Sequence, residues 1–70
     1  MKHKYEIIIY WSADDNAFIA EAPELAGSKA DGSSYAEAVK NIEVVIGEWI
    51  ETATILKRPI PKPKGKLVYA

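Results

Sequence analysis

The carboxylates are the residues of this sequence that could most readily take part in catalysis or metal binding. Asp14 and Asp15 are neighbours in a turn-like segment, and Glu21, Glu24 and Asp31 follow within 16 residues. A carboxylate cluster of this kind could hold Mg²⁺ for phosphoryl chemistry. Aspartate is also an ordinary turn former, because its side chain bonds its own backbone. We favour the second interpretation.

The remaining composition argues against catalysis. The chain has no cysteine and a single histidine, so structural zinc sites and multi-histidine metal sites are excluded, and a histidine-based triad has little support. The four glycines are scattered, which leaves no phosphate-binding loop. We therefore predict that the protein is not an enzyme and uses no catalytic residue, metal or cofactor.

Charge is unevenly distributed along the chain. Residues 1–56 contain ten acids and four lysines, a net charge of −6, whereas residues 57–70 contain five basic residues and no acid. An acidic body repels phosphates and suits a basic protein partner. The basic tail leaves a small nucleic-acid-binding domain as the alternative function.

The length of 70 residues predicts one domain, residues 1–70. No segment has the roughly 20 apolar residues of a membrane span, and no signal peptide is recognised, so we expect a cytoplasmic protein without membrane contact. A chain this small buries only about 60–65% of its unfolded surface. Self-association would add to that burial.

Three strands are expected before the helix. The segment Tyr5 to Trp11 is rich in isoleucine and aromatic residues and apolar on both faces, as in an interior strand. A polar turn at 12–16 leads into a second strand, Ala17 to Ala22, which makes a hairpin. A short third strand, Ser28 to Ala30, ends at an Asp-Gly pair.

One long helix follows. Ser34 and Glu37 have the spacing of a capping box, and Pro59 prevents continuation at the other end. Apolar residues recur at helical spacing from Tyr35 to about Leu56. The predicted buried stripe consists of Tyr35, Ala38, Val39, Ile42, Val45, Ile46, Trp49, Ile50, Ala53 and Leu56.

A fourth strand, Lys66 to Ala70, completes an α+β fold of order β-β-β-α-β. A right-handed crossover places it parallel to the first strand, so that the sheet order is 3-2-1-4. A helix of some 22 residues is about 33 Å long, whereas a seven-residue strand spans roughly 23 Å. The helix end should therefore overhang, and a homodimer or larger assembly could bury Trp49, Ile50, Ala53 and Leu56.

Several segments of the chain, taken together in their order and spacing, resemble the HicB family of antitoxins over nearly the whole length. The matching segments are Tyr5-Glu6-Ile7-Ile8-Ile9-Tyr10, Ala17-Phe18-Ile19-Ala20-Glu21-Ala22-Pro23-Glu24-Leu25, Gly27, Ala30-Asp31-Gly32, Ser34-Tyr35, Glu37-Ala38, Asn41, Trp49-Ile50-Glu51, Arg58-Pro59-Ile60-Pro61 and Pro63.

The resemblance implies a reduced ribonuclease-H-like fold without its catalytic acids. It also implies binding and inhibition of HicA, a small basic mRNA-cleaving toxin, and self-association. Many family members add a C-terminal DNA-binding domain; this sequence stops at Ala70 without one, so we expect no direct DNA binding.

A toxin-binding antitoxin should present acids to a basic active-site face, around one or two buried anchors. The expected toxin-contacting residues are Trp11, Asp14, Asp15, Glu21, Glu24 and Leu25.

Overall fold

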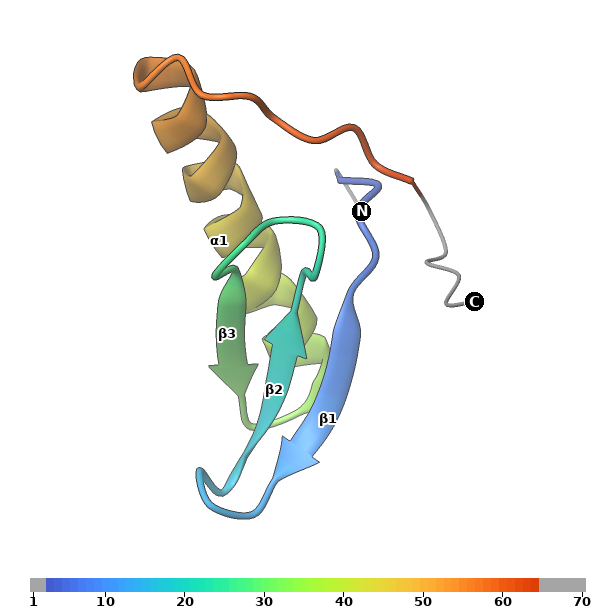
Figure 1. Cartoon of the computed structure of the whole chain (residues 1–70). Helices are drawn as coiled ribbons and strands as arrows, with labels where there is room; N and C mark the ends of the chain where they lie inside the picture. Colours follow the sequence, from blue (N-terminus) through green and yellow to red (C-terminus); the bar gives the residue numbers. More distant parts are fainter. Residues whose placement is uncertain (1–2, 65–70) are drawn as a thin grey trace.

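The first two strands form a tight hairpin in the computed structural model, which describes residues 3–64 (Figure 1). Strand β1 (Ile8–Ser12) pairs antiparallel with β2 (Ala17–Glu21), with Ser12 opposite Ala17. At the turn, Asn16 adopts a φ of 51°, in the left-handed region that asparagine tolerates. The expected hairpin is confirmed, although β1 begins at Ile8 instead of Tyr5.

Strand β3 (Lys29–Gly32) pairs antiparallel with the other side of β2, which gives the sheet order β1-β2-β3. The loop from Ala22 to Ser28 is closed by its own backbone: the Ala22 N–H donates to Ser28 O at 3.1 Å, and the Ser28 N–H donates to Leu25 O at 3.0 Å. The third strand therefore starts one residue later than expected and continues to Gly32.

Helix α1 (Tyr35–Ile55) begins where the capping signal predicts. Ser34 Oγ accepts a hydrogen bond from the Glu37 N–H at 3.1 Å. The Glu37 carboxylate accepts a hydrogen bond from the Ser33 N–H at 2.9 Å. A capping box would instead place this bond on the N–H of Ser34, one residue later. The bond to Ser34 Oγ satisfies one of the backbone donors that a helix start leaves free.

The helix ends in a left-handed turn that carries a lysine. Lys57 has a φ of 55°. Its N–H donates to Thr54 O at 3.2 Å, and the Arg58 N–H donates to Ala53 O at 2.8 Å. These two bonds define a Schellman motif, whose left-handed position is usually glycine.

We expect Lys57→Gly to stabilise the protein, because glycine removes the Cβ strain of the left-handed conformation. Part of that gain is offset by the greater backbone entropy of glycine in the unfolded chain, which leaves about 0.5–1 kcal/mol. Urea unfolding followed by circular dichroism measures the change. Lys62→Gly, in an extended segment, is the control and should not stabilise; an equal gain in both variants would contradict this account of the helix end.

Helix α1 lies across one face of the sheet and packs on β3 and β2 (Figure 1). The core between the two layers is formed by residues of the N-terminal segment, β2, the loop after it and α1. Its buried members are Tyr5, Ala20, Ala22, Leu25, Ala38, Ile42 and Ile46.

Strand β1 is one of the two edge strands of the sheet within the described residues, and its Ile8 and Tyr10 are exposed. The expected interior position of this strand depends on a fourth strand at Lys66–Ala70, which lies outside the described residues. The three-stranded α+β core is thus observed. The 3-2-1-4 order and the ribonuclease-H-like assignment stay predictions.

The predicted helix stripe is wrong at its two ends. Tyr35, in the first turn of the helix, is 61% exposed. Leu56 is also exposed, and its backbone caps the helix. The central positions of the stripe are buried or half-buried, as expected.

The apolar residues at the C-terminal end of the helix are less exposed than expected from the difference in length between helix and strands. Ala53 is only 4% exposed. Trp49 is half-buried, and its Nε1–H donates to Ala26 O in the β2–β3 loop at 3.0 Å. Trp49 and Ala53 therefore already pack within the chain, while Leu56 remains exposed and Ile50 half-exposed.

Residues 57–64 run from the end of α1 back to the N-terminal segment (Figure 1). The Tyr5 hydroxyl donates to Pro61 O. The Glu24 carboxylate accepts from the Lys64 N–H at 2.9 Å and from the Glu6 N–H at 3.4 Å. Glu24 thereby joins three separate parts of the chain. Within residues 3–64, no helix combines the length and apolar character needed to cross a membrane.

Candidate protein-interaction surface

Three aromatic side chains form a row, which we call the aromatic row, at the end of the sheet where α1 begins. Trp11 of β1 meets Phe18 of β2 edge to face, with ring centroids 5.1 Å apart. Phe18 in turn meets Tyr35 of α1, with centroids 4.4 Å apart. Trp11 is 51% exposed and Tyr35 is also exposed, so both outer members of the row face solvent.

Strand alternation places this row on the same face of the sheet as the core. Phe18 lies two residues before the buried Ala20, and Trp11 is directly opposite Phe18 in the strand register. Trp11 remains exposed because α1 packs on β2 and β3 and starts only at Tyr35. Exposed aromatic residues of this kind are the commonest anchors of protein–protein interfaces.

The acidic turn, residues 12–16, follows Trp11 directly. Asp14 and Asp15 are both exposed there. Ser12 Oγ donates to Asp15 Oδ2 at 2.9 Å and accepts from the Asp15 N–H at 3.3 Å. These bonds hold the carboxylate of Asp15 in one orientation at the tip of the hairpin. We call the aromatic row and the acidic turn together the turn surface.

The other expected contact acids lie at the opposite end of the hairpin. Glu21 pairs with Ile8, at the end of β2 farthest from the turn. Its carboxylate accepts from the Tyr10 hydroxyl at 3.3 Å and lies 3.7 Å from Lys29 Nζ. Glu24 is occupied by the backbone bonds described above. The expected group of four acids is therefore split, with only Asp14 and Asp15 beside Trp11.

Leu25 does not serve as a surface anchor, contrary to expectation. It is 1% exposed and belongs to the core. Sequence reasoning also missed Tyr35 and Phe18 as members of the surface. The available signal was the capping serine, since a residue directly after it lies in the first helical turn.

The carboxylates show no metal-binding geometry in the described part of the chain: no three His, Asp or Glu side chains there are placed to hold an ion. The acidic turn and the Glu21–Glu24 region are separated by the length of β2. What the described residues do present is a hydrophobic row with an acidic border.

The fold and this surface define a small α+β protein whose exposed aromatic residues adjoin an acidic hairpin. The chain belongs to the UPF0150 family. It is 32% identical over 63 residues to the UPF0150 protein ssl0259 of Synechocystis sp. (strain ATCC 27184 / PCC 6803 / Kazusa), a match that spans 90% of this chain and 85% of that protein. No family model matches the chain, and no solved structure is significantly similar to it.

Proposed function

We propose that the protein is a HicB-like antitoxin that binds and inhibits a HicA-type mRNA-cleaving toxin through the turn surface. Two lines of argument support this proposal. The sequence resembles HicB antitoxins over nearly its whole length, and the turn surface combines exposed aromatic residues with two exposed aspartates. The observation that carries it is the exposed Trp11 beside the acidic turn.

The proposed mechanism is steric and electrostatic. A toxin that cleaves RNA must present cations to phosphates, so Asp14 and Asp15 would compete with RNA for that basic face. Trp11 and Tyr35 would supply apolar area that is removed from water on binding. In this mechanism the chain blocks catalysis by another protein and performs none itself.

Charge reversal distinguishes the turn surface from the basic segment at 57–64. We expect Asp14→Lys/Asp15→Lys to slow association with the cognate toxin about tenfold at low salt, because exposed charges steer encounter. The effect should shrink as salt rises, since the Debye length falls. Stopped-flow mixing at two ionic strengths measures both quantities.

The matched control reverses two cations in the extended segment, Lys62→Glu/Lys64→Glu. These lysines have the sign of the toxin surface, so their reversal should leave inhibition intact. Loss of inhibition in the lysine variant, with none in the aspartate variant, would refute the turn surface as the contact. The two lysines are exposed and make no ion pair within residues 3–64, so they are available to phosphates. If the protein binds RNA and the lysine variant does not, that result would favour the alternative of a nucleic-acid-binding domain.

We also propose that the protein self-associates. Exposed apolar side chains remain on β1 and at the end of α1, among them Ile8, Tyr10, Ile55 and Leu56. Sedimentation equilibrium at micromolar concentration should therefore give a mass of at least twice the 7.7 kDa of one chain. A single species of monomer mass across that concentration range would contradict this expectation.

The direct test of the toxin partner is co-purification. The protein, carrying an affinity tag, is expressed with the neighbouring reading frame that encodes a small basic protein with a single histidine. We expect both chains to elute together at a fixed ratio and to separate when Trp11 is replaced by alanine. Elution of the tagged chain alone, while it is folded, would contradict the proposal.

A further inference from the structure

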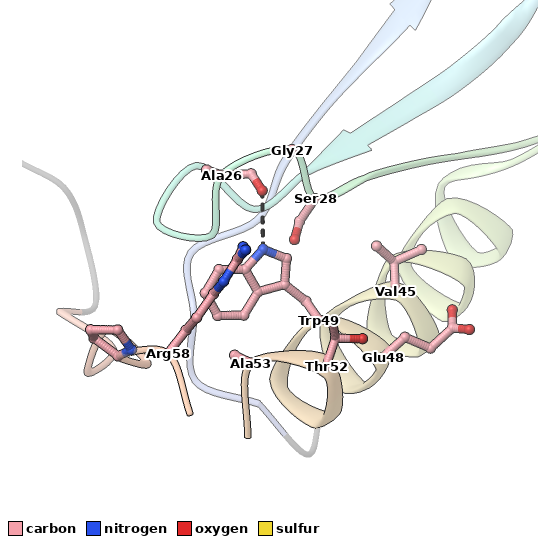
Figure 2. A pocket seen from close by; sticks show the side chains of 10 residues that line it. Ala26, Gly27, Ser28, Val45, Glu48, Trp49, Thr52, Ala53 and Arg58 are labelled. Atoms are coloured by element: carbon pink, nitrogen blue, oxygen red, sulfur yellow. Dashed lines mark hydrogen bonds between the residues drawn. The ribbon is translucent and has the colours of Figure 1, made fainter. Parts of the chain in front are cut away.

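A pocket of about 610 Å³ lies between the C-terminal half of α1 and the loop that joins β2 to β3 (Figure 2). This volume falls in the range of small-molecule sites, roughly 300–1,000 Å³. The apolar part of its wall comes from Val45, Trp49, Ala53 and Pro59. The pocket is remote from the turn surface, which adjoins the first turn of the same helix.

The wall of the pocket is held in place by hydrogen bonds. The Trp49 Nε1–H donates to Ala26 O, which fixes the indole beneath the loop (Figure 2). Gly27 supports the loop with a φ of 80°, a conformation suited to glycine. The apolar wall of the site is therefore already in place in the free chain, so that a ligand need not order the indole on binding.

Ser28 brings an unpaired polar group to this wall. The residue is 4% exposed, and its Oγ has no hydrogen-bond partner among the described residues. Its side chain points from the loop toward the helix, into the space between Trp49 and Val45 (Figure 2). A buried hydroxyl without a partner is unfavourable, and buried polar groups are normally satisfied. Because the Ser28 Oγ has almost no exposed surface, a ligand oxygen reaches it only when the loop and the helix move slightly apart, and it would then accept the hydrogen bond of the hydroxyl.

The two charged residues of the pocket lie at opposite ends. Arg58 extends beside the Trp49 indole, and Glu48 lies on the far side of that ring (Figure 2). Arg58 makes no ion pair within residues 3–64. A guanidinium is the side chain best suited to a carboxylate, which it can bind through two parallel hydrogen bonds. Glu48 repels an anion from the other end, so the charges also fix the direction in which a ligand enters.

We propose that this pocket binds a small carboxylate with a flat apolar body. The apolar body packs on Trp49 and Val45, the carboxylate pairs with Arg58, and the Ser28 hydroxyl donates to a ligand oxygen. The proposal is independent of toxin binding, because it uses none of the residues of the turn surface.

The test is an NMR titration of the full chain with 3-phenylpropanoate. The indole N–H signals of ¹⁵N-labelled protein report on Trp49 and Trp11 separately, and Trp11→Phe assigns them. We expect the Trp49 signal to shift saturably while the Trp11 signal stays in place. 3-Phenylpropanamide, which lacks the charge, and propanoate, which lacks the ring, should each bind about tenfold more weakly. An unchanged Trp49 signal, or equal binding of acid and amide, would overturn the proposal.

Variants assign the roles of the polar groups. Arg58→Gln should weaken 3-phenylpropanoate binding about tenfold, whereas the control Lys62→Gln should leave it unchanged. Ser28→Ala should weaken binding without lowering the stability of the free chain, because its hydroxyl has no partner there to lose. Full binding by both Arg58→Gln and Ser28→Ala would overturn the assignment of these groups.

Discussion

Under the proposed antitoxin function, replacement of Trp11 by alanine is expected to weaken toxin binding by about 30-fold or more. Trp11 is half-exposed in the free chain and meets Phe18 edge to face, so its ring is presented to a partner in a fixed orientation. Truncation removes the largest exposed apolar side chain of the turn surface. Surface plasmon resonance with the cognate toxin measures the dissociation constant.

Tyr10→Ala is the matched control for this experiment. Tyr10 is an exposed aromatic residue of the same strand. It directly precedes Trp11, and successive side chains of a strand point to opposite faces of the sheet. Its replacement should change toxin affinity little. Thermal unfolding of both variants checks that each is folded. A loss of affinity confined to Tyr10→Ala would move the contact to the other face of the sheet.

Gly32→Ala is expected to destabilise the protein by about 3 kcal/mol. A Cβ at Gly32 would lie 2.5 Å from Ala38 N and 2.8 Å from Glu37 C, which are backbone atoms of the first helical turns. No side-chain rotation relieves such a clash, so the helix must move away from β3. Because α1 supplies much of the core, this displacement costs packing along the whole interface.

Gly47→Ala, in helix α1, is expected to stabilise the protein. A Cβ there meets no atom within 4 Å, and alanine is favoured over glycine in a helix interior by about 0.5–1 kcal/mol. Urea unfolding should therefore give a lower midpoint for Gly32→Ala and a higher one for Gly47→Ala. Equal midpoints for the two variants would contradict the close approach of β3 and α1.

Local signals predicted the hairpin and the helix of the described residues. The serine cap, the helical spacing of apolar residues and the following proline placed α1 within a residue of its observed ends. The polar turn between two apolar runs placed the β1–β2 hairpin. These features are decided by residues near one another in sequence, which is why the sequence alone sufficed.

The candidate site was predicted only in part, because it depends on distances that a sequence does not contain. Asp14 and Glu21 are seven residues apart, but β2 separates them along its length. Leu25 lies two residues after Pro23 in an irregular segment without periodicity, and nothing local indicated that it enters the core. The bond from Trp49 to Ala26 joins residues 23 positions apart, so the pocket beneath that loop was not foreseen.

The most direct test of the central proposal is inhibition of RNA cleavage by the purified cognate toxin. A labelled RNA is incubated with toxin and increasing amounts of this protein, with the protein alone as the control. We predict that cleavage falls to background near a fixed molar ratio, that Trp11→Ala fails to suppress it at the same ratio, and that the protein alone leaves the RNA intact. Undiminished cleavage in the presence of excess folded protein would contradict the antitoxin function.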